Sequence, residues 1–179
     1  QDDASFPWLT VWENIAFGLR RGNMDNAQIK ERVDYAINFM GLKGFAMSRP
    51  SELSGGMRQR VCIARTFVME PRLILLDEPF GSLDQQTRIL MGDELLRLWR
   101  ETGATVLLIT HSLDEAALLS DRIGVMSARP GQFIDIVETG WPADRDSRMA
   151  SKDEFGKVTT QLWEQLRDES LKAMGEENT

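Results

Sequence analysis

The sequence predicts an α/β fold whose strands form a parallel sheet. Two short aliphatic runs, at 73–76 and 106–109, have the length and composition of strands buried on both faces. Helices are expected at 85–101 and 113–120, and a further strand at 122–126. Alternation of strand and helix along the chain is typical of sheets whose strands run in the same direction.

Composition and charge narrow the class of protein. The chain has 179 residues, of which 42% are hydrophobic and 27% charged, so a disordered, collagen-like or disulfide-rich chain is excluded. It has one cysteine, which cannot form an internal disulfide. Lys and Arg number 21 against 28 Asp and Glu, a net charge of −7 that argues against binding to a nucleic-acid backbone.

The apolar runs are too short to cross a membrane. The longest contain four residues, at 73–76 and 106–109, whereas a helix needs roughly 20 apolar residues to span a bilayer. Any membrane association is therefore expected to be peripheral and to go through partner proteins.

Further elements are expected on either side of the 73–126 region. Thr10 and Glu13 have the spacing of a capping box at the start of a short helix. A helix is predicted over 25–47, with Gly41 as a C-terminal stop. Residues 133–137 suit a last strand, and residues 141–149 are polar without a period. A final amphipathic helix is marked by Phe155, Val158, Leu162 and Leu166.

A serine and two glycines begin one predicted helix, at Ser54, Gly55 and Gly56, followed by Met57. Glycines let a ligand approach the backbone closely, and the free N–H groups at a helix start favour an anion such as phosphate. The same residues equally suit an ordinary serine cap with a flexible entry.

Two adjacent carboxylates, Asp77 and Glu78, follow the first aliphatic run. This is the end of a strand at which α/β sheets place their ligand crevice. Asp77 suits a magnesium partner, and Glu78 suits a general base that takes a proton from water. The alternative is that they simply end the strand at the surface.

Two weaker signals lie further along the chain. His111 is the single histidine of the sequence and follows the second aliphatic run. It is equally compatible with a structural role and with a function at physiological pH. The segment Ser82-Leu83-Asp84 alone indicates no more than a turn that caps the next helix.

In combination these segments resemble the ATP-binding cassette (ABC) ATPases. The segment 53–59 is similar to their signature motif, 73–78 to their Walker B strand, 82–84 to their D-loop and His111 to their switch histidine, in the family's order. Gln1 falls where the family has its Q-loop glutamine. The strings Pro7–Asn14 and Met126–Gly131, with Met57 in the signature, resemble the nitrate, sulfonate, taurine and bicarbonate importers.

The resemblance implies ATP and Mg²⁺ as cofactors and two subunits that face each other head to tail. It assigns Ser54, Gly55, Gly56 and Met57 to the γ-phosphate of a nucleotide held by the second subunit. Asp77 and Gln1 would serve the magnesium ion, and Glu78 would polarise the attacking water. His111 would bridge the γ-phosphate and the D-loop, in which Ser82, Leu83 and Asp84 connect the two active sites.

The resemblance also implies partners and a location. The expected partners are a second ATPase subunit, transmembrane permease subunits and, indirectly, a periplasmic or lipoprotein solute-binding protein, but no nucleic acid. The expected location is the cytoplasmic side of the inner membrane. Phe6, Trp8, Leu9 and Val11 are candidates for a groove that receives a permease helix, or for closing their own core.

The family's glycine-rich phosphate loop with its Lys-Ser or Lys-Thr does not occur in this sequence. We therefore expect a cassette truncated at its N-terminus and inactive alone. The predicted domains are a partial ATPase domain at 1–140 and a helical extension at 141–179. The first contains the Q-loop and signature subdomain at 1–70 and the Walker B, D-loop and histidine core at 71–140.

Two other classes of function remain open on the sequence. The first is a DNA-maintenance or translation-factor ATPase with the same motifs; the DNA-maintenance kind carries a long coiled coil before the signature, and residues 2–52 show no sustained heptads. The second is a truncated cassette without catalysis, which pairs with another cassette.

Overall fold

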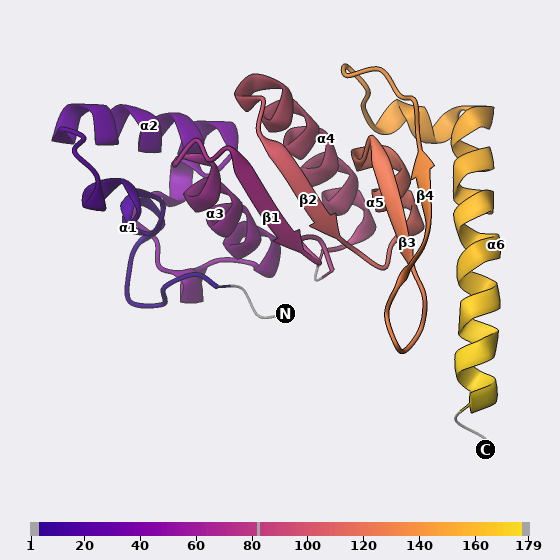
Figure 1. The fold of residues 1–179 in the computed structure, drawn as a ribbon. Coiled ribbons are helices and arrows are strands. Elements are labelled where there is room, and N and C mark those ends of the chain that lie inside the picture. Colours follow the sequence, from indigo (N-terminus) through magenta and orange to yellow (C-terminus); the bar gives the residue numbers. More distant parts are fainter. Residues whose placement is uncertain (1–3, 82, 177–179) are drawn as a thin grey trace. The chain divides into compact units, whose positions relative to one another are not determined.

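A computed structural model describes residues 4–81 and 83–176, and the chain divides into two compact units, 1–107 and 108–179. Figure 1 shows the order of the helices and strands along the two units. Within the described residues, every helix is too short or too polar to cross a membrane. The expected boundary between domains at 140 is tested by no observation and stays a prediction.

The first unit begins with three helices, α1 (Val11–Ala16), α2 (Asn26–Phe39) and α3 (Gly55–Phe67). The predicted capping box starts α1: the Thr10 side chain accepts from the N–H of Glu13, and the Glu13 carboxylate accepts from the N–H of Thr10. These helices share a core of fully or nearly fully buried side chains: Val11, Ile15, Val33, Ile37, Val61, Ala64 and Phe67.

The helix predicted over 25–47 is shorter than expected. It ends at Phe39, and Gly41 has a φ of +66°, in the left-handed region that glycine adopts at helix ends. The chain then makes a 3₁₀ turn, η2 (Lys43–Phe45), and further 3₁₀ turns lie at η1 (Leu19–Arg21) and η3 (Pro50–Glu52). The prediction named the correct stop but extended the helix past it.

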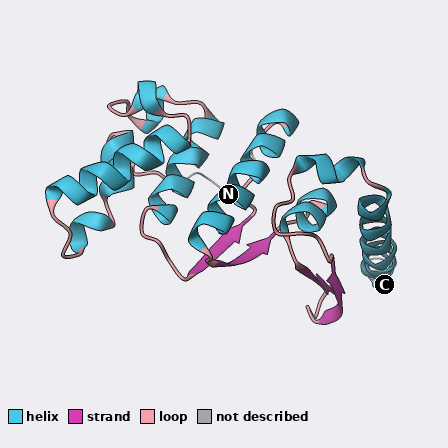
Figure 2. Ribbon diagram, turned by 90° about the horizontal axis from the view of Figure 1, so that it is seen from above, coloured by secondary structure: helices cyan, strands magenta, loops and turns pink. Residues whose placement is uncertain are grey.

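Strand β1 (Leu73–Asp77) pairs with β2 (Thr105–Ile109), and α4 (Gln85–Thr102) connects them. The two strands run in the same direction in Figure 1, as the sequence predicted. Burial on both faces was wrong for both strands. In β1, Ile74 is buried, whereas Leu73 is 55% exposed and Leu75 67% exposed, and in β2, Leu107 and Ile109 are each 56% exposed. Successive side chains of a strand point to opposite faces, and Figure 2 shows the neighbouring helices on one side of this strand pair.

The second unit contains α5 (Leu113–Leu119), β3 (Arg122–Met126), β4 (Phe133–Glu138), the 3₁₀ turn η4 (Ser147–Ser151) and α6 (Asp153–Glu176). The expected addition of β3 to the parallel sheet is not seen among the described residues, where β3 and β4 form an antiparallel hairpin that is a sheet of its own, separate from the β1–β2 pair. Only six residues, 127–132, join β3 to β4, which suits a hairpin and is too short for the crossover that parallel strands need.

The hairpin and α6 share a core within the second unit. Ile123, Val125 and Val137 of the hairpin are buried together with Leu162 of α6. A neighbouring cluster of Ala117, Met149 and Phe155 joins α5 to η4 and the start of α6. The predicted amphipathic helix therefore packs its apolar face within this unit.

Candidate functional site

Helix α3 begins as the sequence predicted. Ser54 is its N-cap, and its Oγ accepts a hydrogen bond from the backbone N–H of Met57 at 3.3 Å. Gly55 and Gly56 form the first helical positions, where backbone N–H groups have no partner within the helix. This helix start, where Ser54 is exposed and Gly55 and Gly56 are half-buried, combines backbone donors without an intrahelical partner, the positive end of the helix dipole and two residues without side chains, which together favour an anion.

The start of α3 is attached to the segment that follows the carboxylate pair. The Gln59 side-chain nitrogen donates to the backbone oxygen of Pro79 at 2.6 Å. A Cβ on Gly56 would lie 3.2 Å from Leu83 Cδ2, so the two segments are in close contact there. Sequence reasoning assigned no role to Gln59. The available signal was its spacing, because residues three apart on a helix share a face.

The carboxylate pair occupies the strand end that the sequence predicted. Asp77 is the last residue of β1 and is exposed, and Glu78 is half-buried. Glu78 has a φ of +46°, in the left-handed region that non-glycine residues rarely adopt. A tight turn follows, in which the N–H of Gly81 donates to the backbone oxygen of Glu78 at 3.2 Å.

Strain of this kind tends to persist at functional sites, where the surroundings hold it in place. The Glu78→Gly and Glu78→Ala variants both remove the carboxylate, but glycine alone relieves the backbone. We expect the glycine variant to be the more stable by about 1 kcal/mol, measured by chemical denaturation of both proteins. Equal stability of the two variants would show that the Glu78 backbone stores no strain.

Leu83 and Asp84 connect this segment to α4. Leu83 is buried at 6% exposure, and the Asp84 carboxylate caps α4 by accepting from the backbone N–H of Thr87 at 2.9 Å and from its hydroxyl at 2.6 Å. These hydrogen bonds, that of the Thr87 hydroxyl first, lower the pKa of Asp84 below its usual value. The predicted cap is confirmed, whereas the role of Asp84 between subunits stays a prediction. Ser82 lies outside the described residues.

His111 belongs to the second unit, where it is exposed between β2 and α5. Its two neighbours are held by hydrogen bonds: the N–H of Ser112 donates to Thr110 Oγ1 at 3.0 Å, and Thr110 Oγ1 donates to the buried Glu115 carboxylate at 2.7 Å. Gln1, the predicted Q-loop residue, lies outside the described residues.

The candidate docking residues 6–11 separate into two groups. Val11 is fully buried, so it belongs to the core of the first unit. Phe6 is half-buried, with its ring 4.6 Å from that of Phe17 and the Arg65 guanidinium 4.7 Å from its centre. Leu9 is half-buried, whereas Trp8 is 66% exposed and is the candidate most available to a partner.

Asp77 and Glu78 are the carboxylates available to a metal ion at the end of β1. No group of three or more His, Cys, Asp or Glu side chains that could hold a metal ion occurs among residues 4–81 and 83–176. The donor set fits a magnesium ion that arrives with a nucleotide, because such an ion is usually bound through one or two carboxylates and the substrate phosphates.

Comparison with known proteins identifies the family. The family model described as "ABC transporter" matches residues 1–81. The taurine import ATP-binding protein of Pelagibacter ubique is 48% identical over 133 residues, which are 74% of this chain and 50% of that protein. An aliphatic sulfonates import ATP-binding protein of Bacillus cereus is 42% identical over 164 residues, 92% of this chain and 64% of that protein.

A solved structure agrees with the sequence relatives. A dimeric ATP-binding cassette in a post-hydrolysis state, bound to ADP and phosphate, matches with a TM-score of 0.66 and 32% identity, over 77% of this chain and 60% of that one. This chain spans less than two thirds of the length of the curated relatives it matches. High identity over most of its own length, together with the same fold, means that the chain belongs to the ABC transporter family and carries part of an ATP-binding cassette.

Proposed function

We propose that the intact subunit containing this chain binds and hydrolyses ATP to drive import of a small anionic solute. The relatives named for taurine and aliphatic sulfonate import support this solute class over DNA maintenance or translation. The net charge of −7 also favours a partner other than nucleic acid.

One observation carries the proposal. The start of α3, whose first backbone N–H groups have no partner within the helix, contacts through Gln59 and Gly56 the segment that follows Asp77 and Glu78. One chain thus presents an anion-binding helix start next to the segment that carries the carboxylate pair. Phosphoryl transfer depends mainly on positioning and charge neutralisation, and this contact sets the relative placement of the groups that one chain would offer to two nucleotides.

The nucleotide would lie between two subunits. Ser54, Gly55, Gly56 and Met57 would contact the γ-phosphate of ATP held by the second subunit, through the donors at the start of α3. The related cassette is a dimer bound to ADP and phosphate, which supports both the substrate and the two-subunit arrangement. We infer a homodimer, because two copies of the same chain can then supply the two different faces of each site.

The carboxylates would divide the chemistry between them. Asp77 would hold the magnesium ion, which supplies charge neutralisation on the phosphates when bound. Glu78 would accept a proton from the attacking water. Gln1 would contact the ion and the water, and His111 would bridge the γ-phosphate and the D-loop, in which Asp84 links the two sites.

Coupling to transport would pass through permease subunits in the membrane. The exposed Trp8, beside the half-buried Phe6, offers an aromatic surface to an amphipathic helix of the permease. The subunit would then lie on the cytoplasmic side of the membrane. A solute-binding protein would contact it indirectly, through the permease.

The proposal is tested by reconstituting the intact subunit with its permease and solute-binding protein in lipid vesicles. We expect ATP hydrolysis to be stimulated by taurine or an alkanesulfonate and not by a cationic amine of similar size. Stimulation of ATP hydrolysis by DNA would contradict the proposed import function. So would a rate of hydrolysis that none of the anionic solutes increases.

A further inference from the structure

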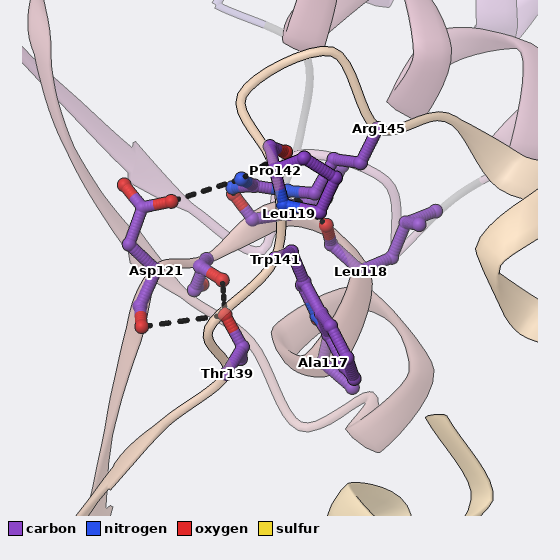
Figure 3. Close-up of polar contacts among 9 residues, drawn as sticks. Ala117, Leu118, Leu119, Asp121, Thr139, Trp141, Pro142 and Arg145 are labelled. Atoms are coloured by element: carbon purple, nitrogen blue, oxygen red, sulfur yellow. Dashed lines mark hydrogen bonds and ion pairs between the residues drawn. The ribbon is translucent and has the colours of Figure 1, made fainter. Parts of the chain in front are cut away.

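Arg145 is a buried arginine in a segment that the ATPase motifs do not include. Its guanidinium, 1% exposed, donates from Nε to Leu118 O at 2.8 Å and from Nη2 to Leu119 O at 3.0 Å. It also pairs with the Asp121 carboxylate at 2.9 Å (Figure 3). Leu118 and Leu119 end α5, whose last carbonyls have no partner within the helix. Arg145 therefore closes the C-terminal end of α5.

Two further side chains of the same segment act on the same helix end. The Trp141 indole nitrogen donates to Ala117 O at 2.7 Å, and the Thr139 hydroxyl donates to Ser120 O at 2.9 Å. Figure 3 shows these side chains arranged around the final turn of α5. We call Thr139, Trp141 and Arg145 the α5 clamp.

The other end of α5 holds the neighbours of His111. Ser112 caps the helix by accepting from the N–H of Glu115 at 3.3 Å, and the buried Glu115 carboxylate accepts from the Thr110 hydroxyl at 2.7 Å. The N–H of Ser112 in turn donates to that hydroxyl. Thr110 and Ser112, on either side of His111, are thus fixed to the first turn of α5.

Helix α5 is too short to hold this arrangement without help. Its seven residues span about 10 Å and, as an isolated helix, would not be stable in water. Its position and its regularity depend on contacts at its ends. We therefore expect a change at the C-terminal clamp to reach the first turn and the backbone of His111.

We propose that Arg145 is a positioning residue for His111, acting through α5. The effect of Arg145 on catalysis rests on the proposed function, in which His111 contacts the γ-phosphate. The segment around 141–149, which carries no recognisable motif in the sequence, then serves the active site by fixing the helix that presents the histidine.

The structural part is tested by NMR of the intact subunit, in Arg145→Met and in Arg148→Met as a matched control. The imidazole signal of His111 is identified by its loss in His111→Ala, and this chain contributes no other histidine. Arg148 lies in the same segment but its side chain is 88% exposed and pairs with Asp146. We expect the signal to shift and broaden in Arg145→Met and to stay unchanged in Arg148→Met. An unchanged signal in both variants would overturn the proposal.

The catalytic part is tested by a double-mutant cycle in ATP hydrolysis. We expect Arg145→Met to lower kcat about 10-fold with little change in KM, because a misplaced group costs turnover more than binding. In a His111→Ala background the same substitution should have little further effect. An equal loss of kcat in both backgrounds would show that Arg145 does not act through His111.

Two further outcomes are distinguishable. If Arg145→Met fails to fold, Arg145→Lys takes its place, because lysine keeps the charge but cannot donate to Leu118, Leu119 and Asp121 in the same fixed geometry. The lysine variant is then expected to show the imidazole shift, and a signal identical to wild type would overturn the proposal. If the wild-type subunit does not hydrolyse ATP, the proposed function fails, while the NMR comparison still decides the role of Arg145.

Discussion

Replacing Glu78 with glutamine in the intact subunit is expected to lower the ATP turnover number by about 10²- to 10⁴-fold. Glutamine has nearly the same shape but cannot accept the proton of the attacking water. The binding of ATP is expected to be unchanged, because in the proposed site the phosphates contact the helix start and the magnesium ion. Steady-state hydrolysis and equilibrium binding of a fluorescent ATP analogue measure the two quantities.

The chain offers a matched control for this substitution. Glu70 is a second glutamate in the left-handed backbone region, with a φ of +48°, and its carboxylate pairs with Arg32 at 3.1 Å. Glu70→Gln removes the same charge from the same backbone conformation, and turnover should remain close to wild type. Full turnover in Glu78→Gln would remove Glu78 from the role of general base.

Substitution of Ser54 is expected to have the second-largest effect. Aspartate and asparagine both cap helices as well as serine does, so Ser54→Asp and Ser54→Asn should retain α3. They differ in charge alone, and the aspartate would face the γ-phosphate held by the second subunit. Like charges brought together across an interface cost several kcal/mol, so we expect ATP-dependent dimerisation of Ser54→Asp to be about 100-fold weaker than that of Ser54→Asn.

Both variants are made in the Glu78→Gln background, so that bound ATP is not hydrolysed. Light scattering at increasing protein concentration in the presence of ATP then measures the difference in dimerisation. Circular dichroism of both variants checks that the helix content is equal. Dimerisation of the two variants at the same concentration would show that Ser54 does not face the nucleotide, and the signature helix would then lose its proposed role.

The local features of the fold could be predicted from the sequence. Thr10, Ser54 and Asp84 each cap a helix whose start the sequence located, because each cap contacts a backbone N–H three residues further on. Strand β3 was predicted with its observed bounds, 122–126, and α4 differs from its expected end by one residue. The α/β fold followed from the alternation of strands and helices, and the family followed from the order of short motifs.

Features that depend on distant parts of the chain could not be predicted. The alternation of elements before β3 favoured a strand of the parallel sheet, whereas β3 pairs with β4 in a separate antiparallel hairpin. The aliphatic run of β1 has the composition of a strand buried on both faces, yet its exposure depends on which helices cover it.

Caps, strand ends and the motif order were determined by the sequence alone, because each depends on residues within a few positions of one another. The tertiary structure decided the contact of Gln59 with Pro79, 20 residues apart, and that of Arg145 with Leu118, 27 residues apart. The spacing of Gln59 indicates its helix face but not its partner, and Arg145 has no local signal, since a polar side chain finds a distant partner only when packing brings the two segments together. These contacts hold the signature helix to the carboxylate segment and fix the helix that follows His111.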